Sequence, residues 1–345
     1  MRSTTPCAPC RLQHPVADRG ADVDESFDGT ARPRYAGRMI RLIACAGASL
    51  LACTHSPRAP AADDPAPAPR VGASADAPAI TVTHVAGPVH MIEGRGGNIG
   101  VSVGADGKLM IDDQFAPLAP AIEQAIDRLG DGPLRLLVNT HFHGDHTGGN
   151  PIFGKRALIV AHDNVRKRLA APQPRGDAVQ PAMAPEGLPV VTFAESVTLH
   201  FNGEPIRVIH LPHGHTDGDS IVYFTGSHVI HMGDHYFNGR FPFIDLAAGG
   251  DVVQYTANVA KVIEMLPPDA KVIPGHGPLS DVAGLRAFHA MLVATTAAIR
   301  AQMQQGKRPD QIVLDPKWAS WGQGFVPTDR WIATVYESLQ RSAAQ

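Results

Sequence analysis

The stretch His141-Phe142-His143-Gly144-Asp145-His146 brings four candidate metal ligands together within six residues. It follows an apolar run of strand length, Leu134–Val138, and precedes residues 147–150, a turn that we expect to open a helix. A loop after a buried strand holds its side chains rigidly and still leaves them open to solvent. Imidazole nitrogens suit Zn²⁺ and a carboxylate adds a harder oxygen, so the stretch predicts a zinc site. A surface histidine cluster is the alternative, but chance rarely places an aspartate in register after a strand.

Three further candidate ligands follow the ends of later short strands, each beside a glycine. They are His215 in a Gly-His-Thr turn, Asp234 after Gly233, and His276 in a Pro-Gly-His-Gly turn. Glycine permits the sharp turn and the close backbone approach that a metal loop requires. His213, two residues before His215, stays open as the ligand in its place.

The ordered series HxHxDH, GHT, GD and PGHG resembles the metallo-β-lactamase-fold hydrolases, from about residue 80 to at least His276. The resemblance implies an α/β protein, an αββα four-layer sandwich with its metals at one edge. It implies two zinc ions per chain: the first held by His141, His143 and His215, the second by Asp145, His146 and His276, with Asp234 bridging them. It also implies that Asp112 braces the ligand loop without binding a metal.

Asp234 occupies the position where many zinc β-lactamases have cysteine. This departure favours the thioesterase, lactonase and phosphodiesterase members of the family over its lactamases. His231 and His235 flank Asp234, and we interpret them either as donors to the metal ligands or as packed or solvated histidines.

Two metals that share one water lower its pKa to near neutrality and give a bridging hydroxide. Asp145 would be the catalytic residue that orients this nucleophile. We therefore predict a dinuclear zinc hydrolase of small acyl substrates: a β-lactam, a lactone or a related ester or amide. The alternative is a non-hydrolytic metal-binding or redox accessory protein. A redox member would need a flavin module, and we expect none after Pro278.

Two loops are candidates for substrate contact. Residues 236–244 follow Asp234, and we expect Phe237 to form an apolar wall and Arg240 to bind a carboxylate. Phe241 and Phe243 belong either to this wall or to the core. The glycine-rich turn 94–99 is predicted to be a mobile flap, as the resemblance suggests.

The chain has 345 residues, 44% of them hydrophobic, and a formal net charge of −3. This balance gives no electrostatic case for nucleic acid, so we expect a small-molecule substrate as the partner. All the cysteines lie within the first 53 residues, at positions 7, 10, 45 and 53. The catalytic region is therefore predicted to contain neither disulfides nor thiolate ligands.

Residues 39–53 resemble a lipoprotein signal peptide: a start and a basic residue, an apolar run, and Leu50-Leu51-Ala52-Cys53. We expect translation to start at Met39, with residues 1–38 an unstructured extension. Residues 54–79, rich in alanine and proline, read as a tether to a catalytic domain at 80–345. The protein is thus predicted to be exported to the periplasm and to touch a membrane only through a lipid on Cys53. Export argues against cytosolic glutathione thioesters and tRNA precursors as substrates.

Apolar patterning predicts the elements of the catalytic domain. Strands are expected at 80–85, 89–92, 99–103, 109–111, 134–138 and 157–161, with a meander over 190–232. Helices are expected at 116–129, 165–169, 252–266, 285–305 and 327–341, and a proline-rich surface excursion at 171–189.

Overall fold

The strand before the histidine motif lies inside a seven-stranded sheet in the computed structural model, which describes residues 80–175 and 178–343. The predicted extension, signal peptide and tether at 1–79 lie outside the described residues. The sheet has the order β1-β2-β3-β4-β5-β6-β9. Its strands are β1 (Thr81–Ala86), β2 (Val89–Glu93), β3 (Ile99–Gly104), β4 (Gly107–Ile111), β5 (Leu134–Val138), β6 (Leu158–His162) and β9 (Val191–Phe193). Strands β1 to β4 pair antiparallel, whereas β4, β5, β6 and β9 run parallel.

A second sheet of six strands faces the first and has the order β10-β11-β12-β13-β14-β15. Its strands are β10 (Ser196–Phe201), β11 (Glu204–His210), β12 (Ser220–Phe224), β13 (Val229–His231), β14 (Lys271–Ile273) and β15 (Ser280–Asp281). All neighbours pair antiparallel except β13 and β14, which run parallel. A separate hairpin is made by β7 (Gln173–Arg175) and β8 (Ala178–Gln180).

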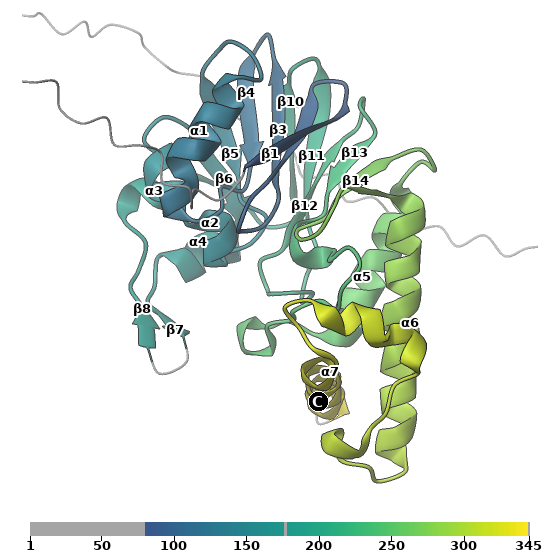
Figure 1. Ribbon diagram of the computed structural model, residues 1–345. Helices are drawn as coiled ribbons and strands as arrows, with labels where there is room; N and C mark the ends of the chain where they lie inside the picture. The colour runs from purple at the N-terminus through teal and green to yellow at the C-terminus, as the bar shows by residue number, and fades with distance from the viewer. Residues whose placement is uncertain (1–79, 176–177, 344–345) are drawn as a thin grey trace, which may run out of the picture. The chain divides into compact units, whose positions relative to one another are not determined.

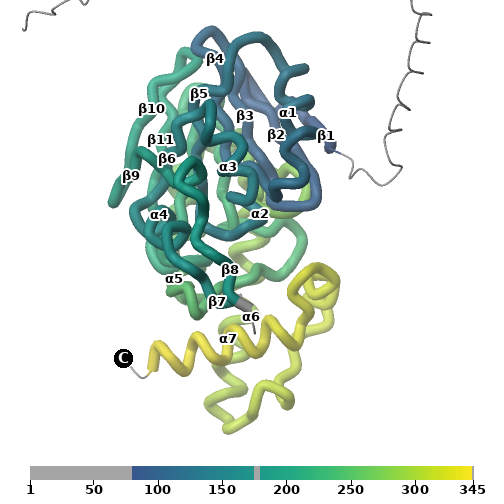
Figure 2. The backbone as a smooth tube through the Cα atoms, turned by 90° about the vertical axis from the view of Figure 1, so that its left-hand side faces the viewer, coloured from purple at the N-terminus to yellow at the C-terminus, as the bar shows by residue number. Residues whose placement is uncertain are grey.

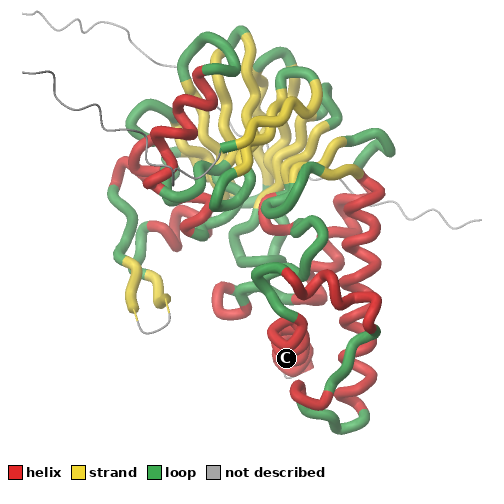
Figure 3. Tube along the Cα trace, in the orientation of Figure 1, coloured by secondary structure: helices red, strands yellow, loops and turns green. Residues whose placement is uncertain are grey.

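The two sheets pack face to face over a shared apolar core, to which the first sheet contributes Met91 and Val138 and the second Val208 and Val222. Helices cover both outer faces, as Figures 1 and 3 show. The helices are α1 (Ala119–Asp127), α2 (Gly144–Thr147), α3 (Asn150–Phe153), α4 (Asp163–Leu169), α5 (Val252–Met265), α6 (Val282–Gln304) and α7 (Thr328–Ala343). The first four accompany the first sheet, and α5 to α7 pack in the core beside the second. The predicted αββα sandwich is confirmed.

The long C-terminal helices begin at aspartates that cap them. The Asp251 carboxylate accepts a hydrogen bond from the backbone N–H of Gln254 at 2.8 Å, and α5 starts at Val252, the residue after Asp251. Asp281 caps α6 in the same way. Helix α6 is long and apolar enough to cross a membrane, but Leu285 and other side chains of α6 are buried in the core. This burial is what a core helix requires.

Some element boundaries differ from those predicted. The predicted helix 116–129 is a 3₁₀ turn, Ala116–Leu118, followed by α1. The helix expected to open after the motif is α3, which begins at Asn150, and a further short helix, α2, starts at Gly144 inside the motif. The excursion 171–189 contains the β7–β8 hairpin. The 3₁₀ helix Pro316–Gln323 was not predicted, because its sequence shows no regular spacing of apolar residues. Its Trp321 packs on Phe288, with ring centroids 6.1 Å apart.

The segments that follow several strands meet at one edge of the sandwich. Parallel β4 and β5 end beside each other, as do parallel β13 and β14, so the residues after these four strands face one region. Figure 2 shows α5 and α7 beyond that edge. All the candidate ligands lie after strand ends there or in adjoining turns.

Candidate metal centre

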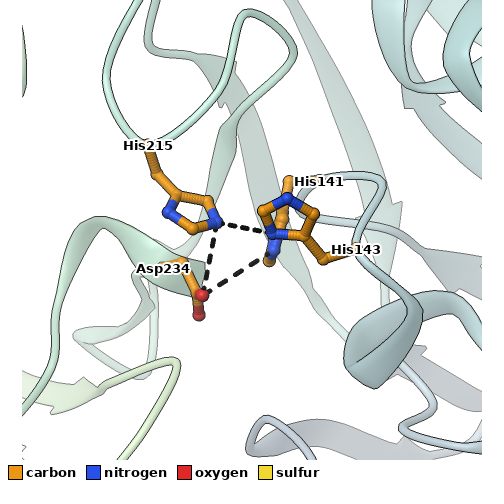
Figure 4. A group of neighbouring side chains, drawn as sticks. All are labelled: His141, His143, His215 and Asp234. Carbon is orange, nitrogen blue, oxygen red and sulfur yellow. Dashed lines mark hydrogen bonds and ion pairs between the residues drawn. The ribbon is translucent and has the colours of Figure 1, made fainter. Parts of the chain in front are cut away.

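The first cluster consists of His141, His143, His215 and Asp234, whose ligand atoms all lie within 4.8 Å of one another. His143 Nδ1 is 2.8 Å from His215 Nε2, and Figure 4 shows the side chains converging from separate loops. The Asp234 Oδ2 atom is 3.4 Å from His215 Nε2 and 3.8 Å from His141 Nε2. Three imidazoles and one carboxylate oxygen therefore surround a single point.

The second cluster consists of Asp145, His146 and His276, again with ligand atoms within 4.8 Å of one another. His146 Nε2 lies 3.4 Å from His276 Nε2, and His276 Nε2 lies 3.4 Å from the Asp145 carboxylate. This cluster is more open than the first, because the side chains of Asp145 and His276 are 30% and 22% exposed. An ion here would be reachable by a small molecule.

Asp234 joins the two clusters, because its two carboxylate oxygens face different ones. Oδ2 faces the first cluster, while Oδ1 is 3.1 Å from His146 Nε2 and 3.4 Å from His276 Nε2 in the second. The Asp234 side chain is almost fully buried. One carboxylate can therefore supply an oxygen to each of two ions.

Hydrogen bonds on the outer ring nitrogens aim the histidines inward. The Nδ1–H of His146 donates to Asp112 Oδ2 at 2.7 Å, and the Nδ1–H of His215 donates to the Phe243 carbonyl at 2.7 Å. His143 is turned the other way: its Nε2–H donates to Asp245 Oδ2 at 3.1 Å, which leaves Nδ1 for the cluster. Such outer partners fix the ring orientation and tautomer of metal-binding histidines.

Asp112 links this arrangement to the backbone of the motif. Its carboxylate accepts hydrogen bonds from the Thr140 backbone N–H at 2.8 Å and from the Thr140 hydroxyl at 2.7 Å. The same hydroxyl accepts from His141 Nδ1–H at 3.0 Å. Asp112 has φ +60, a left-handed conformation that aspartate adopts more readily than most residues other than glycine. Its single carboxylate thus orients two histidines, one in each cluster.

Two orphaned atoms test whether the clusters fit metal ions. His141 Nε2 and Asp234 Oδ1 are fully buried, and neither makes a hydrogen bond within the described part of the chain. Buried polar atoms are nearly always bonded, so such atoms pointing into a cluster require another partner. Both belong to the donor types that Zn²⁺ prefers, imidazole nitrogen and carboxylate oxygen. Two clusters with a shared carboxylate fit a dinuclear metal site.

The pKa values follow from burial and from the carboxylates. Burial lowers the pKa of His215 to about 4. Burial also acts on His276, but Asp234 and Asp145 outweigh it and raise its pKa to about 9. Although burial opposes ionisation, His276, His146 and the other imidazoles hold the pKa of Asp234 well below its usual range. Without metal the centre already contains an ionised bridging carboxylate.

The remaining predicted histidines lie outside the clusters. His213 is exposed, with its Nδ1 3.2 Å from the Gly249 carbonyl. His231 is buried and donates from Nε2 to the Asn98 carbonyl at 2.9 Å. His235 is stacked on Tyr255, with ring centroids 5.1 Å apart. Within the described residues none of the three rings forms a hydrogen bond, ion pair or stacking contact with a candidate ligand: His231 and His235 are packed in the interior, and His213 lies at the surface.

The residues predicted to contact substrate differ in their exposure and in their distance from the candidate ligands. Phe237 is only 3% exposed and stacks on the His276 ring at 5.0 Å, so it supports a candidate ligand and offers little surface. Arg240 is partly exposed, and its side chain runs past Gly324. Phe241 belongs to the core, stacked on Trp331. Phe243 is half-buried, 5.8 Å from the His215 ring and 5.9 Å from the His143 ring.

The glycine-rich turn 94–99 covers the second cluster. The Gly97 backbone N–H donates to the Asp145 carbonyl at 3.0 Å, and a Cβ on Gly97 would lie 2.0 Å from the His146 ring. The Asn98 backbone N–H donates to the Gly275 carbonyl at 2.7 Å. The turn is therefore tied to both loops of the second cluster, and its mobility stays a prediction.

Asp245 and the Phe243 carbonyl are functional groups that sequence reasoning missed. Asp245 lies 102 residues after His143 and also caps the 3₁₀ turn Leu246–Ala248, which is a common use of aspartate. A carbonyl has no signature in a sequence. The only available signal was that both groups lie in the loop shortly after Asp234.

Comparisons with known proteins agree with this architecture. A family model described as the metallo-beta-lactamase superfamily matches residues 92–276, more than half of the chain. A metallo-beta-lactamase from Pontibacter korlensis superposes with a TM-score of 0.52 at 19% identity, over 62% of this chain and 99% of that one. At that identity the likeness establishes the fold alone.

Alignments with two curated relatives each cover about half of this chain. A probable metallo-hydrolase of Mycobacterium bovis is 30% identical over 193 residues, which cover 48% of this chain and 61% of the relative. A probable metallo-hydrolase of Bacillus subtilis is 28% identical over 182 residues, covering 50% of this chain and 85% of the relative. The chain thus spans less than two thirds of the mycobacterial relative. By the family match and the fold together, the chain belongs to the metallo-beta-lactamase superfamily.

Proposed function

We propose that this protein is a dinuclear zinc hydrolase of small acyl substrates. The observation that carries the proposal is the division of the Asp234 carboxylate, with one oxygen toward each cluster. A carboxylate shared between two clusters of imidazoles can hold two ions close together, as a two-metal site needs. The relatives named probable metallo-hydrolases support the same reaction class.

His141, His143 and His215 would hold the first ion, and Asp145, His146 and His276 the second, with Asp234 shared. When bound, the two ions supply Lewis acidity toward a carbonyl oxygen and lower the pKa of water. His146 and His215 are held in place by Asp112 and the Phe243 carbonyl, so the protein contributes a fixed geometry.

Asp145 has a second task in the proposed reaction. Burial opposes its ionisation, but His146 and His276 prevail and lower its pKa to about 2, so the carboxylate stays ionised at neutral pH. An ionised, partly exposed carboxylate can accept a hydrogen bond from an attacking water and orient it toward an acyl carbon. After attack the same oxygen can receive the proton and pass it to the leaving group.

The ligand chemistry favours oxygen leaving groups. All seven candidate ligands are histidine or aspartate, with oxygen from Asp234 where many zinc β-lactamases use sulfur. Oxygen ligands leave the second ion harder than a thiolate would. We therefore propose lactones and related esters as the substrates handled best, with β-lactams as slower ones.

Elemental analysis and a substrate panel test this proposal. Protein purified without chelator should carry about two zinc ions per chain, as two complete ligand sets require. Nitrocefin, a γ-lactone and an acyl thioester should then be compared for turnover. Asp145→Asn should slow every substrate by about a hundredfold or more, whereas Asp131→Asn, an exposed aspartate outside the centre, should not. Metal content of one ion, or turnover that Asp145→Asn leaves unchanged, would count against the proposal.

We propose in addition that the protein is exported and anchored by a lipid on Cys53. The support is the signal-like run that ends in Leu50-Leu51-Ala52-Cys53 and the alanine- and proline-rich segment after it. Acyl chains on Cys53 would hold the enzyme at a membrane while residues 54–79 separate it from the surface. Mass spectrometry of the mature N-terminus decides this: a chain that keeps Met1, or that starts beyond Cys53 without lipid, contradicts it.

A further inference from the structure

A cluster of one arginine and two aromatic rings lies beside the first ligand cluster. The guanidinium carbon of Arg330 is 5.1 Å from the centre of the Phe243 ring and 5.3 Å from that of the Phe325 ring. The two rings meet edge to face at 6.1 Å. We refer to Phe243, Phe325 and Arg330 as the aromatic–arginine cluster.

Phe243 connects this cluster directly to the candidate metal centre. Its ring lies 5.8 Å from the His215 ring and 5.9 Å from the His143 ring, and its carbonyl accepts the hydrogen bond from His215 Nδ1. Only one side chain therefore separates Arg330 from two candidate ligands of the first ion. A substrate whose acyl group sits at that ion would have its remaining part within reach of Arg330.

The backbone that carries Arg330 is firmly held. Its neighbour Trp331 is fully buried and stacks on Phe241 with centroids 5.4 Å apart and planes 10° from parallel. The Phe241 backbone N–H donates to the Trp321 carbonyl at 2.9 Å. Helix α7 and the loop after Asp234 are thus packed together, and Arg330 projects from a fixed position.

The chemistry of the cluster suits an anion joined to an apolar group. Within the described residues the Arg330 side chain makes neither an ion pair nor a hydrogen bond, whereas Arg341 on the same helix pairs with Glu337. A guanidinium lying on aromatic faces keeps its N–H edge available for a bidentate bond to a carboxylate. Phe325 is 68% exposed, so its ring is open to an apolar group of a ligand.

We infer that the aromatic–arginine cluster is a specificity site that selects acyl substrates carrying a carboxylate and an apolar group. The inference rests on the proposed hydrolase function, because it concerns the substrate of that same site. Arg330 would bind the carboxylate, and the Phe243 and Phe325 rings would contact the apolar part. Phe325 and Arg330 lie beyond residues 92–276, the region that the family model matches, whereas Phe243 lies within it, so the C-terminal part of this chain supplies two of the three residues.

A matched pair of esters tests the specificity of the zinc-loaded full chain. Mono-4-nitrophenyl glutarate and 4-nitrophenyl valerate share the scissile bond and chain length, and only the first carries a carboxylate. The ratio of their kcat/KM values should fall about tenfold in Arg330→Ala, because a charged hydrogen bond to the substrate is lost. The ratio for Arg330→Lys should lie between those of the wild type and Arg330→Ala. Arg341→Ala, a control on the same helix, should keep the wild-type ratio. A merely structural role for Arg330 would slow both esters alike and leave the ratio unchanged.

A binding measurement separates this inference from the proposed hydrolase function. Calorimetric titration should give tighter binding of benzenesulfonate than of neutral methyl phenyl sulfone, and Arg330→Ala should remove the difference. If that result is obtained but neither ester is hydrolysed, the specificity site stands and the proposed function fails. If the esters are hydrolysed, but Arg330→Ala changes neither their ratio nor the binding difference, the inference is overturned and the proposed function stands.

Discussion

The two ligand clusters use the same kinds of side chain but differ in the proton states of their histidines. In the first, burial lowers the pKa of His215 to about 4 and the pKa of His141 well below its usual value. In the second, burial acts on His146 and His276 as well, but Asp234 and the other carboxylates raise both pKa values, that of His276 to about 9. Without metal at neutral pH, His141 and His215 of the first cluster are therefore neutral, whereas His146 and His276 of the second are protonated.

The difference comes from where the carboxylates lie. Asp112, Asp145 and one oxygen of Asp234 all contact His146 or His276. The first cluster has the other oxygen of Asp234, and Asp245 only on the outer side of His143. An ion can enter the first cluster without displacing protons from His141 or His215, whereas an ion entering the second must displace protons from its histidines. The two sites should thus differ in how their affinities depend on pH.

Substitution of the shared carboxylate should have the largest effect, because it removes the link between the clusters. Asp234→Asn keeps the size of the side chain but loses the charge that faces four imidazoles. We expect the zinc content to fall from about two ions to one or fewer and kcat/KM to fall by about a thousandfold or more, since several kcal/mol of metal assistance is lost. Metal analysis and kinetics on the same preparation check this. Two retained ions with normal turnover would show that Asp234 does not bridge.

Lowering the pH should empty the second site before the first. Histidines bind metal only when neutral, so the affinity of the second site should fall by about tenfold per pH unit for each proton that must be displaced. For His276 this loss begins as the pH drops below about 9, whereas for His215 it begins only near 4. After dialysis against buffered zinc at pH 8.5, 7.0 and 5.5, the zinc content should therefore fall from two ions per chain toward one as the pH is lowered. Parallel loss of both ions would contradict the comparison.

The sequence predicted the fold and all seven candidate ligands because both depend on local patterns. The run Leu134–Val138 is a strand at the predicted boundaries. Gly233 and Gly277, beside Asp234 and His276, lie in turns and have φ values of +49 and +100, which favour glycine. A Cβ on Gly275 would lie 2.2 Å from Asp234 Oδ1, so the glycine there makes room for the carboxylate. Spacing and turn chemistry named the candidates at these positions, whereas the division of the ligands between two ions came from the family resemblance.

The parts that could not be predicted depend on contacts between distant residues. Asp245 lies 102 positions from His143, and Arg330 meets Phe243 where the neighbouring Trp331 packs on Phe241. The aromatic residues after Asp234 all look alike in the sequence, yet Phe237 and Phe241 are buried while Phe243 is half-buried beside the ligands. Packing between α7 and this loop decides which ring is available, and no local period encodes it.

Removal of an outer carboxylate should affect the two clusters unequally. Asp112 is fully buried and bonds His146 at 2.7 Å, whereas the Asp245 side chain is 23% exposed and bonds His143 at 3.1 Å. Asp112→Asn should weaken zinc binding at the second site by about 10- to 100-fold at pH 8.5, and Asp245→Asn should weaken the first site by about tenfold or less. Asparagine also tolerates the left-handed backbone at position 112. Chelator competition measures the zinc affinity of both sites. Equal losses of affinity in the two variants would mean that the burial of the outer carboxylate does not determine its effect.

The smallest effect is expected at His213, which lies two residues from a candidate ligand but belongs to neither cluster. His213 is exposed, and its φ of +49 is a conformation that asparagine accepts, so His213→Asn should leave the backbone in place. Its one contact with the Gly249 carbonyl is 3.2 Å long and exposed, so the free energy of unfolding should change by no more than about 0.5 kcal/mol. Zinc content should stay near two ions per chain, whereas the matched variant His215→Asn should lose the first ion. If His213→Asn loses the ion and His215→Asn keeps it, the first cluster would have to be redrawn around the exposed histidine.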